Sequence, residues 1–119
     1  MTNTFKDTWE TYVESWKVAA ADDKRELFKQ CLTTDCQYND PQTLINGWDN
    51  LLTYMQEFHQ QIPGGYFVTT YYLAHSNKSI ARWEMRAGEN LLGDGISYAE
   101  YNADGKLKTM TGFFESPQE

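Results

Sequence analysis

The chain has 119 residues, a length typical of one domain, and its 10 basic and 17 acidic side chains give a net charge of −7. An acidic chain without a run of basic residues does not suit nucleic acid or an anionic membrane surface, because both require clustered positive charge. Hydrophobic residues make up 40% and aromatic residues 15%, which excludes a disordered chain and predicts one core. No apolar run is long enough to span a membrane and no leader opens the chain, so we expect a cytoplasmic protein.

Helical periodicity dominates the first half of the chain. Apolar side chains recur at steps of three and four over residues 5–20 and predict a first helix. Asp23, followed three residues later by Glu26, resembles a capping box, so a second helix is predicted to begin there. A third helix is predicted after Gly47, and Pro63 with the two glycines behind it ends that helix.

A short extended segment, residues 36–40, follows the second helix and stops before a proline. Side chains alternate along a strand, so Cys36, Tyr38 and Asp40 are predicted to share one apolar face. Cys31 and Cys36 are five residues apart, which fits neither a CxxC redox pair nor a zinc knuckle. We expect both cysteines to be small buried residues in a reducing compartment.

Alternation takes over in the second half and predicts antiparallel strands at residues 66–74 and 80–87. After a turn at residues 88–90, a strand is predicted to run on through Ile96 to Tyr101, and a closing strand follows at residues 106–114. In the second of these strands Ala81, Trp83, Met85 and Ala87 face one side, whereas Arg82, Glu84 and Arg86 face the other. One face is therefore expected on the core and the other in water or in a subunit contact. Helices followed by strands indicate the α+β class.

Several short segments, in this order, carry a family resemblance: a Trp-bearing first helix, residues 35–41 (DCQYNDP), the helix from Gly47 to Pro63, the pair Arg82-Trp83, and residues 101–106 (YNADGK). Together they resemble the nuclear transport factor 2-like superfamily, in particular its SnoaL-like polyketide cyclase and ketosteroid isomerase branch. The resemblance covers about residues 5–115 of a single domain, residues 1–119, in which residues 116–119 are expected to form a loose tail.

This resemblance implies an α+β, cone-shaped barrel in which a strongly curved, mostly antiparallel sheet and three N-terminal helices close an apolar pocket. It also implies a homodimer through the outer face of the sheet. Asp40 matches the position of the general-base aspartate of ketosteroid isomerases, and Tyr12 resembles the tyrosine that donates to the oxyanion. Ser97 stands where that branch has an aspartic acid as the second oxyanion donor.

Candidate ligand contacts are mainly aromatic and apolar side chains on the faces expected to form the pocket: Trp16, Tyr38, Met55, Phe58, His59, Trp83, Met85, Ser97, Tyr101, Met110 and Phe114. Structural roles remain open for several of them. Asp40 before a proline is also a common turn element, Tyr12 and Trp16 also fit core packing, and His59 also fits the border of a buried helix face. No metal-ligand spacing and no glycine-rich phosphate loop is present, so we expect neither a metal nor a cofactor.

Two functions remain open at this point. One is a cofactor-independent acid–base enzyme of the isomerase, cyclase or dehydratase type, in which Asp40 moves a proton. The other is a non-catalytic ligand-binding or dimerisation module of the same fold. The expected partners are a hydrophobic small molecule and a second copy of the chain, with neither nucleic acid nor membrane.

Overall fold

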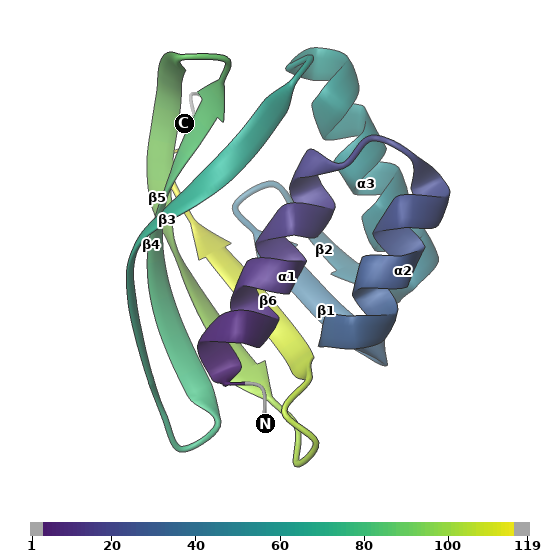
Figure 1. Ribbon diagram of the computed structural model, residues 1–119, viewed down its shortest axis with the longest axis vertical. Coiled ribbons are helices and arrows are strands. Elements are labelled where there is room, and N and C mark those ends of the chain that lie inside the picture. Colours follow the sequence, from purple (N-terminus) through teal and green to yellow (C-terminus); the bar gives the residue numbers. More distant parts are fainter. Residues whose placement is uncertain (1–3, 116–119) are drawn as a thin grey trace.

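A computed structural model describes residues 4–115 of the chain, and the expected tail, residues 116–119, lies outside the described residues. Three helices and six strands follow one another along the chain (Figure 1). Their order is α1 (Phe5–Lys17), α2 (Ala21–Cys31), β1 (Leu32–Asp40), β2 (Thr43–Asn46), α3 (Trp48–Gln61), β3 (Gly65–His75), β4 (Lys78–Ala87), β5 (Asn90–Tyr101) and β6 (Leu107–Phe113).

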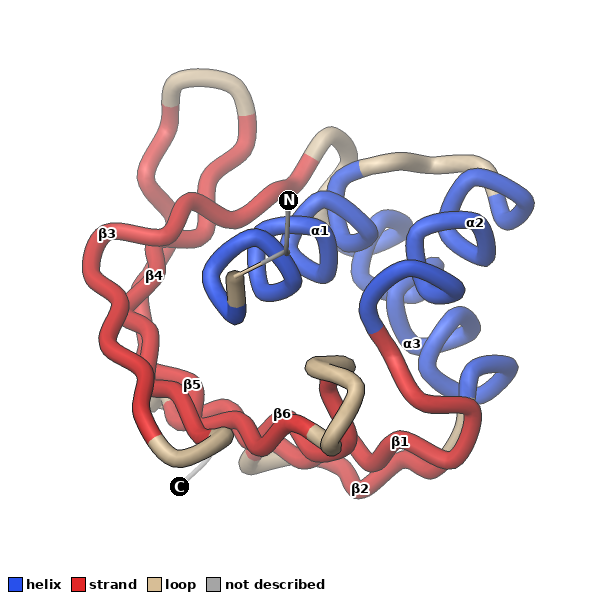
Figure 2. Tube along the Cα trace, turned by 60° about the horizontal axis from the view of Figure 1, so that its bottom comes forward, coloured by secondary structure: helices blue, strands red, loops and turns tan. Residues whose placement is uncertain are grey.

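The six strands form one sheet with the order β2-β1-β6-β5-β4-β3. All neighbouring strands are antiparallel except β1 and β6, which run parallel. The sheet bends strongly, and the three helices cover its concave face (Figure 2). The predicted α+β class with a curved, mostly antiparallel sheet is therefore confirmed.

Helix α1 begins where its sequence provides a cap. The Thr4 side chain accepts a hydrogen bond from the Asp7 N–H, and the Asp7 carboxylate accepts one from the Thr4 N–H. Trp9, Tyr12 and Trp16 then form the buried stripe that faces the sheet. This is the stripe that the sequence periodicity predicted.

Helix α2 corrects a prediction. Its N-cap residue is Ala20, which provides no side-chain hydrogen bond, so the expected capping box of Asp23 and Glu26 is wrong. Asp22 and Asp23 lie in the first helical turn instead, where their negative charges stabilise the helix by interacting with the positive end of its dipole. The spacing alone could not tell a capping position from a first-turn position.

The strands differ in length from their sequence patterns: β1, β3 and β4 are longer than predicted, whereas β6 is one residue shorter at each end. Strand β1 already begins at Leu32, and β5 begins at Asn90, the last residue of the predicted turn. The short strand β2 (Thr43–Asn46) was not predicted. Cys31 and Cys36 are buried free thiols, as expected. Burial raises the pKa of the Cys36 thiol to about 11, so it stays protonated and unreactive at neutral pH.

Side chains fill the space beneath the N-terminal end of α1. Phe5 stacks on Tyr101 with 4.4 Å between ring centroids, and the Tyr101 hydroxyl lies 2.9 Å from the hydroxyls of Tyr72 and Ser79. A cavity lies farther along α1, next to Trp9, Tyr12 and Trp16.

Among the described residues, no helix is long and apolar enough to cross a membrane.

Candidate functional site

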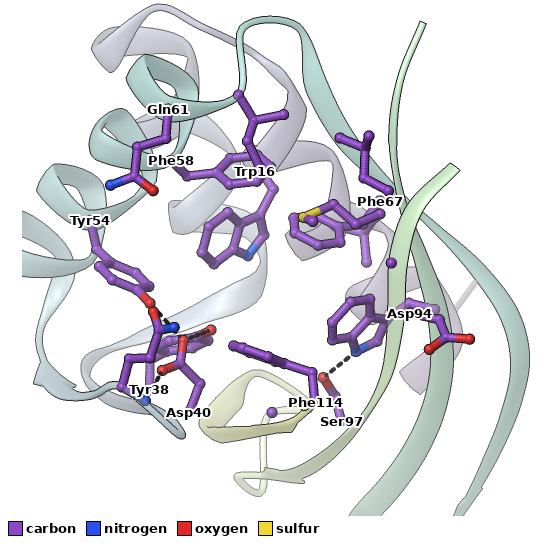
Figure 3. A pocket seen from close by; sticks show the side chains of 18 of the residues that line it. Trp16, Tyr38, Asp40, Tyr54, Phe58, Gln61, Phe67, Asp94, Ser97 and Phe114 are labelled. Carbon is purple, nitrogen blue, oxygen red and sulfur yellow. Dashed lines mark hydrogen bonds between the residues drawn. The ribbon is translucent and has the colours of Figure 1, made fainter. Parts of the chain in front are cut away.

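A cavity of about 510 Å³ lies between helices α1 and α3 and the concave face of the sheet (Figure 3). Both layers contribute to its wall, which is mainly aromatic and aliphatic: Trp9, Tyr12, Val13, Trp16, Tyr38, Tyr54, Phe58, Ile62, Phe67, Trp83, Met85, Leu92 and Phe114. A cavity of this size and composition is typical of sites for small organic molecules.

Trp16 is the centre of the aromatic wall. Its ring makes edge-to-face contacts with Phe58 and Phe67, at centroid distances of 5.5 and 5.4 Å. The rings of Tyr38 and Tyr54 lie 5.8 and 6.1 Å away. Each of these rings restricts the positions that its neighbours can take.

Asp40 is the polar group at one side of this wall, and 7% of its surface is exposed. The hydroxyls of Tyr38 and Tyr54 each donate a 2.7 Å hydrogen bond to its Oδ2 atom. The backbone N–H of Gln42 donates to Oδ1 at 2.8 Å. Asp40 therefore stabilises the β1–β2 turn and also lines the cavity. The turn element and the cavity-facing carboxylate, which the sequence left as alternatives, are thus compatible.

The tyrosines around Asp40 remain protonated at neutral pH. Burial is the main cause that raises the pKa values of Tyr12, Tyr38 and Tyr54 far above the ordinary value, and the nearby Asp40 charge raises them further. These hydroxyls are therefore hydrogen-bond donors rather than bases. Tyr12 itself is almost fully buried in the cavity wall.

Ser97 lies in the wall on β5, opposite the helices. The indole N–H of Trp83 donates a 3.0 Å hydrogen bond to its Oγ atom, which leaves the hydroxyl proton of Ser97 available to another acceptor. The Trp83 ring also makes edge-to-face contacts with the rings of Phe67 and Phe114, at centroid distances of 5.2 and 6.1 Å. One hydroxyl thus stands within an otherwise apolar part of the wall (Figure 3).

The structure brings most of the predicted site residues together. The following line the cavity: Tyr12, Trp16, Tyr38, Asp40, Phe58, Trp83, Met85, Ser97 and Phe114. They come from α1, β1, α3, β4, β5 and the residue that follows β6. Sequence segments far apart in the chain therefore meet at one site, as the strand alternation and the family resemblance implied.

Four predicted ligand contacts lie away from the cavity wall. Met55 and Met110 are fully buried core side chains, and the Tyr101 hydroxyl is engaged with other hydroxyls under α1. The His59 ring is half-buried and its Nε2 atom lies 2.7 Å from the Trp16 carbonyl oxygen. The sequence pattern indicates which face of a helix or strand a side chain occupies. It does not indicate whether that side chain lies in the packed core or beside the cavity.

Other wall residues were not predicted. Phe67 alternates with exposed residues on β3, and Tyr54 lies one helical turn before Phe58, so both carried a periodic signal that could have identified them. Glu57, Asp94 and Glu115 are exposed residues at the edge of the cavity. Asp94, between Gly93 and Gly95, is interpreted from the sequence first as a turn residue and second as a pocket acid. Nothing in the sequence distinguishes Glu57 and Glu115 from ordinary surface acids.

The described wall contains four carboxylates, those of Asp40, Glu57, Asp94 and Glu115, and no Lys, Arg or His side chain. Within residues 4–115 no group of three or more His, Cys, Asp or Glu side chains is arranged to hold a metal ion. The groups present can bind an apolar body, accept hydrogen bonds at Asp40 and donate them from tyrosine and serine hydroxyls.

A curved sheet folded over three helices around an apolar cavity defines the architecture of the nuclear transport factor 2-like proteins. The profile of the SnoaL-like domain matches residues 9–113, nearly the whole chain. The chain therefore belongs to the SnoaL-like family of that superfamily. No curated protein sequence matches it.

Solved structures agree on the fold. A candidate isomerase of the SnoaL-like family from Agrobacterium tumefaciens has a TM-score of 0.85 at 20% identity, over 94% of this chain and 97% of that one. A candidate ketosteroid isomerase from Kribbella flavida has a TM-score of 0.71 at 20% identity, over 97% and 80%. A candidate SnoaL-like polyketide cyclase from Jannaschia sp. CCS1 has a TM-score of 0.71 at 13% identity, over 91% of this chain and 85% of that one. At these identities the likeness concerns the fold alone.

Proposed function

We propose that this protein binds a small, largely apolar molecule in its cavity, and that Asp40 is the polar group that positions the molecule. The observation that carries the proposal is a buried carboxylate facing an aromatic cavity of about 510 Å³. Aromatic side chains provide a large apolar contact area, and one fixed polar group gives orientation.

The rigidity of the wall supports this proposal. Trp16 is fixed by four aromatic neighbours, and Asp40 is fixed by three hydrogen-bond donors. A ligand that enters such a site orders few side chains, so little of its binding free energy is spent on conformational entropy.

Thermal melts and tryptophan fluorescence with steroid, aromatic polyketide and fatty acyl compounds test the proposal. Trp16 and Trp83 lie in the wall, so a bound ligand should quench their fluorescence and raise the melting temperature. Val13→Phe, which adds a ring to the wall, should weaken both effects, whereas Glu14→Phe on the exposed side of α1 should not. If no compound changes either signal, the proposal is wrong.

A second candidate function is proton transfer by Asp40, as in an isomerase, cyclase or dehydratase that needs no cofactor. Its support is that a carboxylate, two protonated tyrosines that touch it, and Tyr12 all face the same apolar space. The carboxylate would accept a proton from carbon, and a tyrosine hydroxyl would donate a hydrogen bond to the developing oxyanion.

Deuterium exchange separates this function from binding alone. A ketone that binds in the cavity should exchange its α-hydrogens in D₂O faster with the protein than without it, and Asp40→Asn should abolish the acceleration. Binding without accelerated exchange would leave the non-catalytic function in place.

We also propose a homodimer that forms through the convex face of the sheet. Leu73 pairs with Ile80 across β3 and β4, and both lie on the face opposite the cavity with exposed fractions of 55% and 42%. Phe113, on the same face of β6, is 57% exposed. An exposed apolar area of this kind is typical of a protein–protein interface.

A further inference from the structure

The charges that face the cavity all have the same sign. Asp40 lies inside, and the exposed carboxylates of Glu57, Asp94 and Glu115 come from α3, β5 and the residues after β6. No basic side chain is found among the described wall residues. A cleft lined by one sign of charge, with low-dielectric walls, concentrates ions of the opposite sign and repels those of the same sign.

Among residues 4–115, Asp40 forms no ion pair with a positively charged side chain. Its three hydrogen-bond donors, Tyr38, Tyr54 and the Gln42 N–H, are all neutral. They satisfy part of its hydrogen-bonding capacity without adding a positive charge beside it, and only 7% of the Asp40 surface is exposed. An opposite charge brought into this space would interact with Asp40 more strongly than at the protein surface.

The aromatic wall favours the same kind of ligand. Nine aromatic side chains line the cavity: Trp9, Tyr12, Trp16, Tyr38, Tyr54, Phe58, Phe67, Trp83 and Phe114. The electron-rich faces of such rings attract cations, and tryptophan attracts them most strongly. This attraction is independent of the carboxylates, and both effects act in the same direction.

We propose that the ligand is an apolar, ring-containing molecule with a protonated amine, and that its ammonium group lies next to Asp40 inside the aromatic wall. This inference rests on the proposed binding function and specifies its ligand class. Asp40 has an oxygen lone pair left for an ammonium proton after its three hydrogen bonds are counted. Apolar molecules with a carboxylate group should bind more weakly, because the described residues of the wall include no Lys, Arg or His side chain to receive them.

Titration calorimetry at neutral pH with three naphthalenes of similar size tests the charge preference: 1-naphthylmethylamine, 1-naphthylmethanol and 1-naphthoate. We expect the amine to bind about tenfold more tightly than the alcohol, and naphthoate about tenfold more weakly than the alcohol. The advantage of the amine should decrease as salt is added, because salt screens the exposed carboxylates at the edge of the cavity.

Substitutions test whether the preference for the amine over the alcohol arises at Asp40. Asp40→Asn should lower the affinity for the amine about tenfold more than the affinity for the alcohol. Asp104→Asn, in the turn between β5 and β6, changes the net charge equally but lies away from the cavity, so it should keep the preference. If Asp40→Asn does not fold, the triple variant Glu57→Gln, Asp94→Asn, Glu115→Gln replaces it and should reduce the advantage of the amine.

The outcomes separate this inference from the function on which it rests. If the alcohol or naphthoate binds as tightly as the amine, the inference is wrong while the apolar binding function stands. If Asp104→Asn removes the preference as fully as Asp40→Asn does, net charge rather than the site is responsible, and the inference is again wrong. If no naphthalene binds at concentrations at which other apolar compounds bind, the amine-ligand inference is wrong while the apolar binding function stands. If neither the naphthalenes nor the other apolar compounds bind, both proposals are wrong.

Discussion

The hydroxyl of Tyr54 on α3 donates a 2.7 Å hydrogen bond to Oδ2 of Asp40 on β1. This bond connects a helix to the sheet across the cavity wall, where most other contacts are between apolar side chains. Tyr38, on the same strand as Asp40, donates to the same oxygen. Tyr54 is therefore the donor that links the position of α3 to the position of the carboxylate.

Tyr54→Phe should lower the free energy of unfolding by about 1–2 kcal/mol, because a buried carboxylate loses one of its donors. Urea melts measure this change. The matched control is Tyr66→Phe, whose hydroxyl donates to the Gly88 carbonyl at an exposed site and should cost less than about 0.5 kcal/mol. Equal losses in the two variants would show that the Tyr54 bond contributes nothing beyond an ordinary surface contact.

Gly95→Ala should destabilise the protein by about 1–3 kcal/mol and disturb the cavity wall. A Cβ atom at this position would lie 2.6 Å from Cη2 of Trp83 and 2.7 Å from the Phe113 carbonyl oxygen, so the indole has to move. Gly93→Ala is the control on the same strand, since its Cβ would lie 3.8 Å from Cε of Met85, an ordinary contact. Thermal melts and near-UV circular dichroism should change for Gly95→Ala alone.

Lys24 should make stability depend on pH in the alkaline range. The residue is buried, and its Nζ atom donates to the carbonyl oxygens of Ser15 and Val18 at the end of α1, at 2.8 and 2.6 Å. Burial lowers the pKa of Lys24 from 10.5 to about 8. Above pH 8 the folded protein releases this proton while the unfolded chain keeps it until about pH 10.5, so the contribution of Lys24 to unfolding free energy rises with pH.

Urea melts at pH 7.5 and 9.5 compare the protein with Lys24→Met to isolate this contribution. The stability difference between the two should shift in favour of the lysine form as the pH increases. Lys29→Met, an exposed lysine in the last turn of α2, should show no such shift. A difference that is the same at both pH values would contradict the prediction.

The proposed homodimer predicts a species of about twice the 13.8 kDa chain mass in light scattering at micromolar concentration. Ile80→Arg places a charge in the apolar area of the convex face and should shift the population to monomer. Gln30→Arg, on the exposed surface of α2, should leave the dimer intact. A monomer for the unmodified protein would contradict the proposed interface.

Strand alternation predicted the orientation of side chains correctly where the strand was regular. Trp83 and Met85 face the cavity, and the side chain between them, Glu84, pairs with Arg86 on the other face. The period of two residues fixes which face a side chain takes, so this information is local and can be obtained from the sequence.

Depth within the cone could not be predicted in this way. Met110 and Phe114 lie on the same face of the last strand and its extension, yet Met110 is sealed in the core and Phe114 lines the cavity. The difference depends on where α1 lies over the sheet, which is a long-range packing property. The Tyr54 contact with Asp40 was missed for the same reason, since it depends on how α3 is placed against β1.

The position of β6 between β1 and β5 affects how the chain can fold during synthesis. Until residues 107–113 leave the ribosome, β1 and β2 cannot join β3, β4 and β5 into one sheet, because β6 is the strand that connects the two sets. A nascent chain therefore exposes the edges of β1 and β5 that β6 later covers, and unpaired strand edges of this kind can bind chaperones or other chains. The cavity is completed only when β6 joins the sheet, because Gly112 and Phe114 form part of its wall.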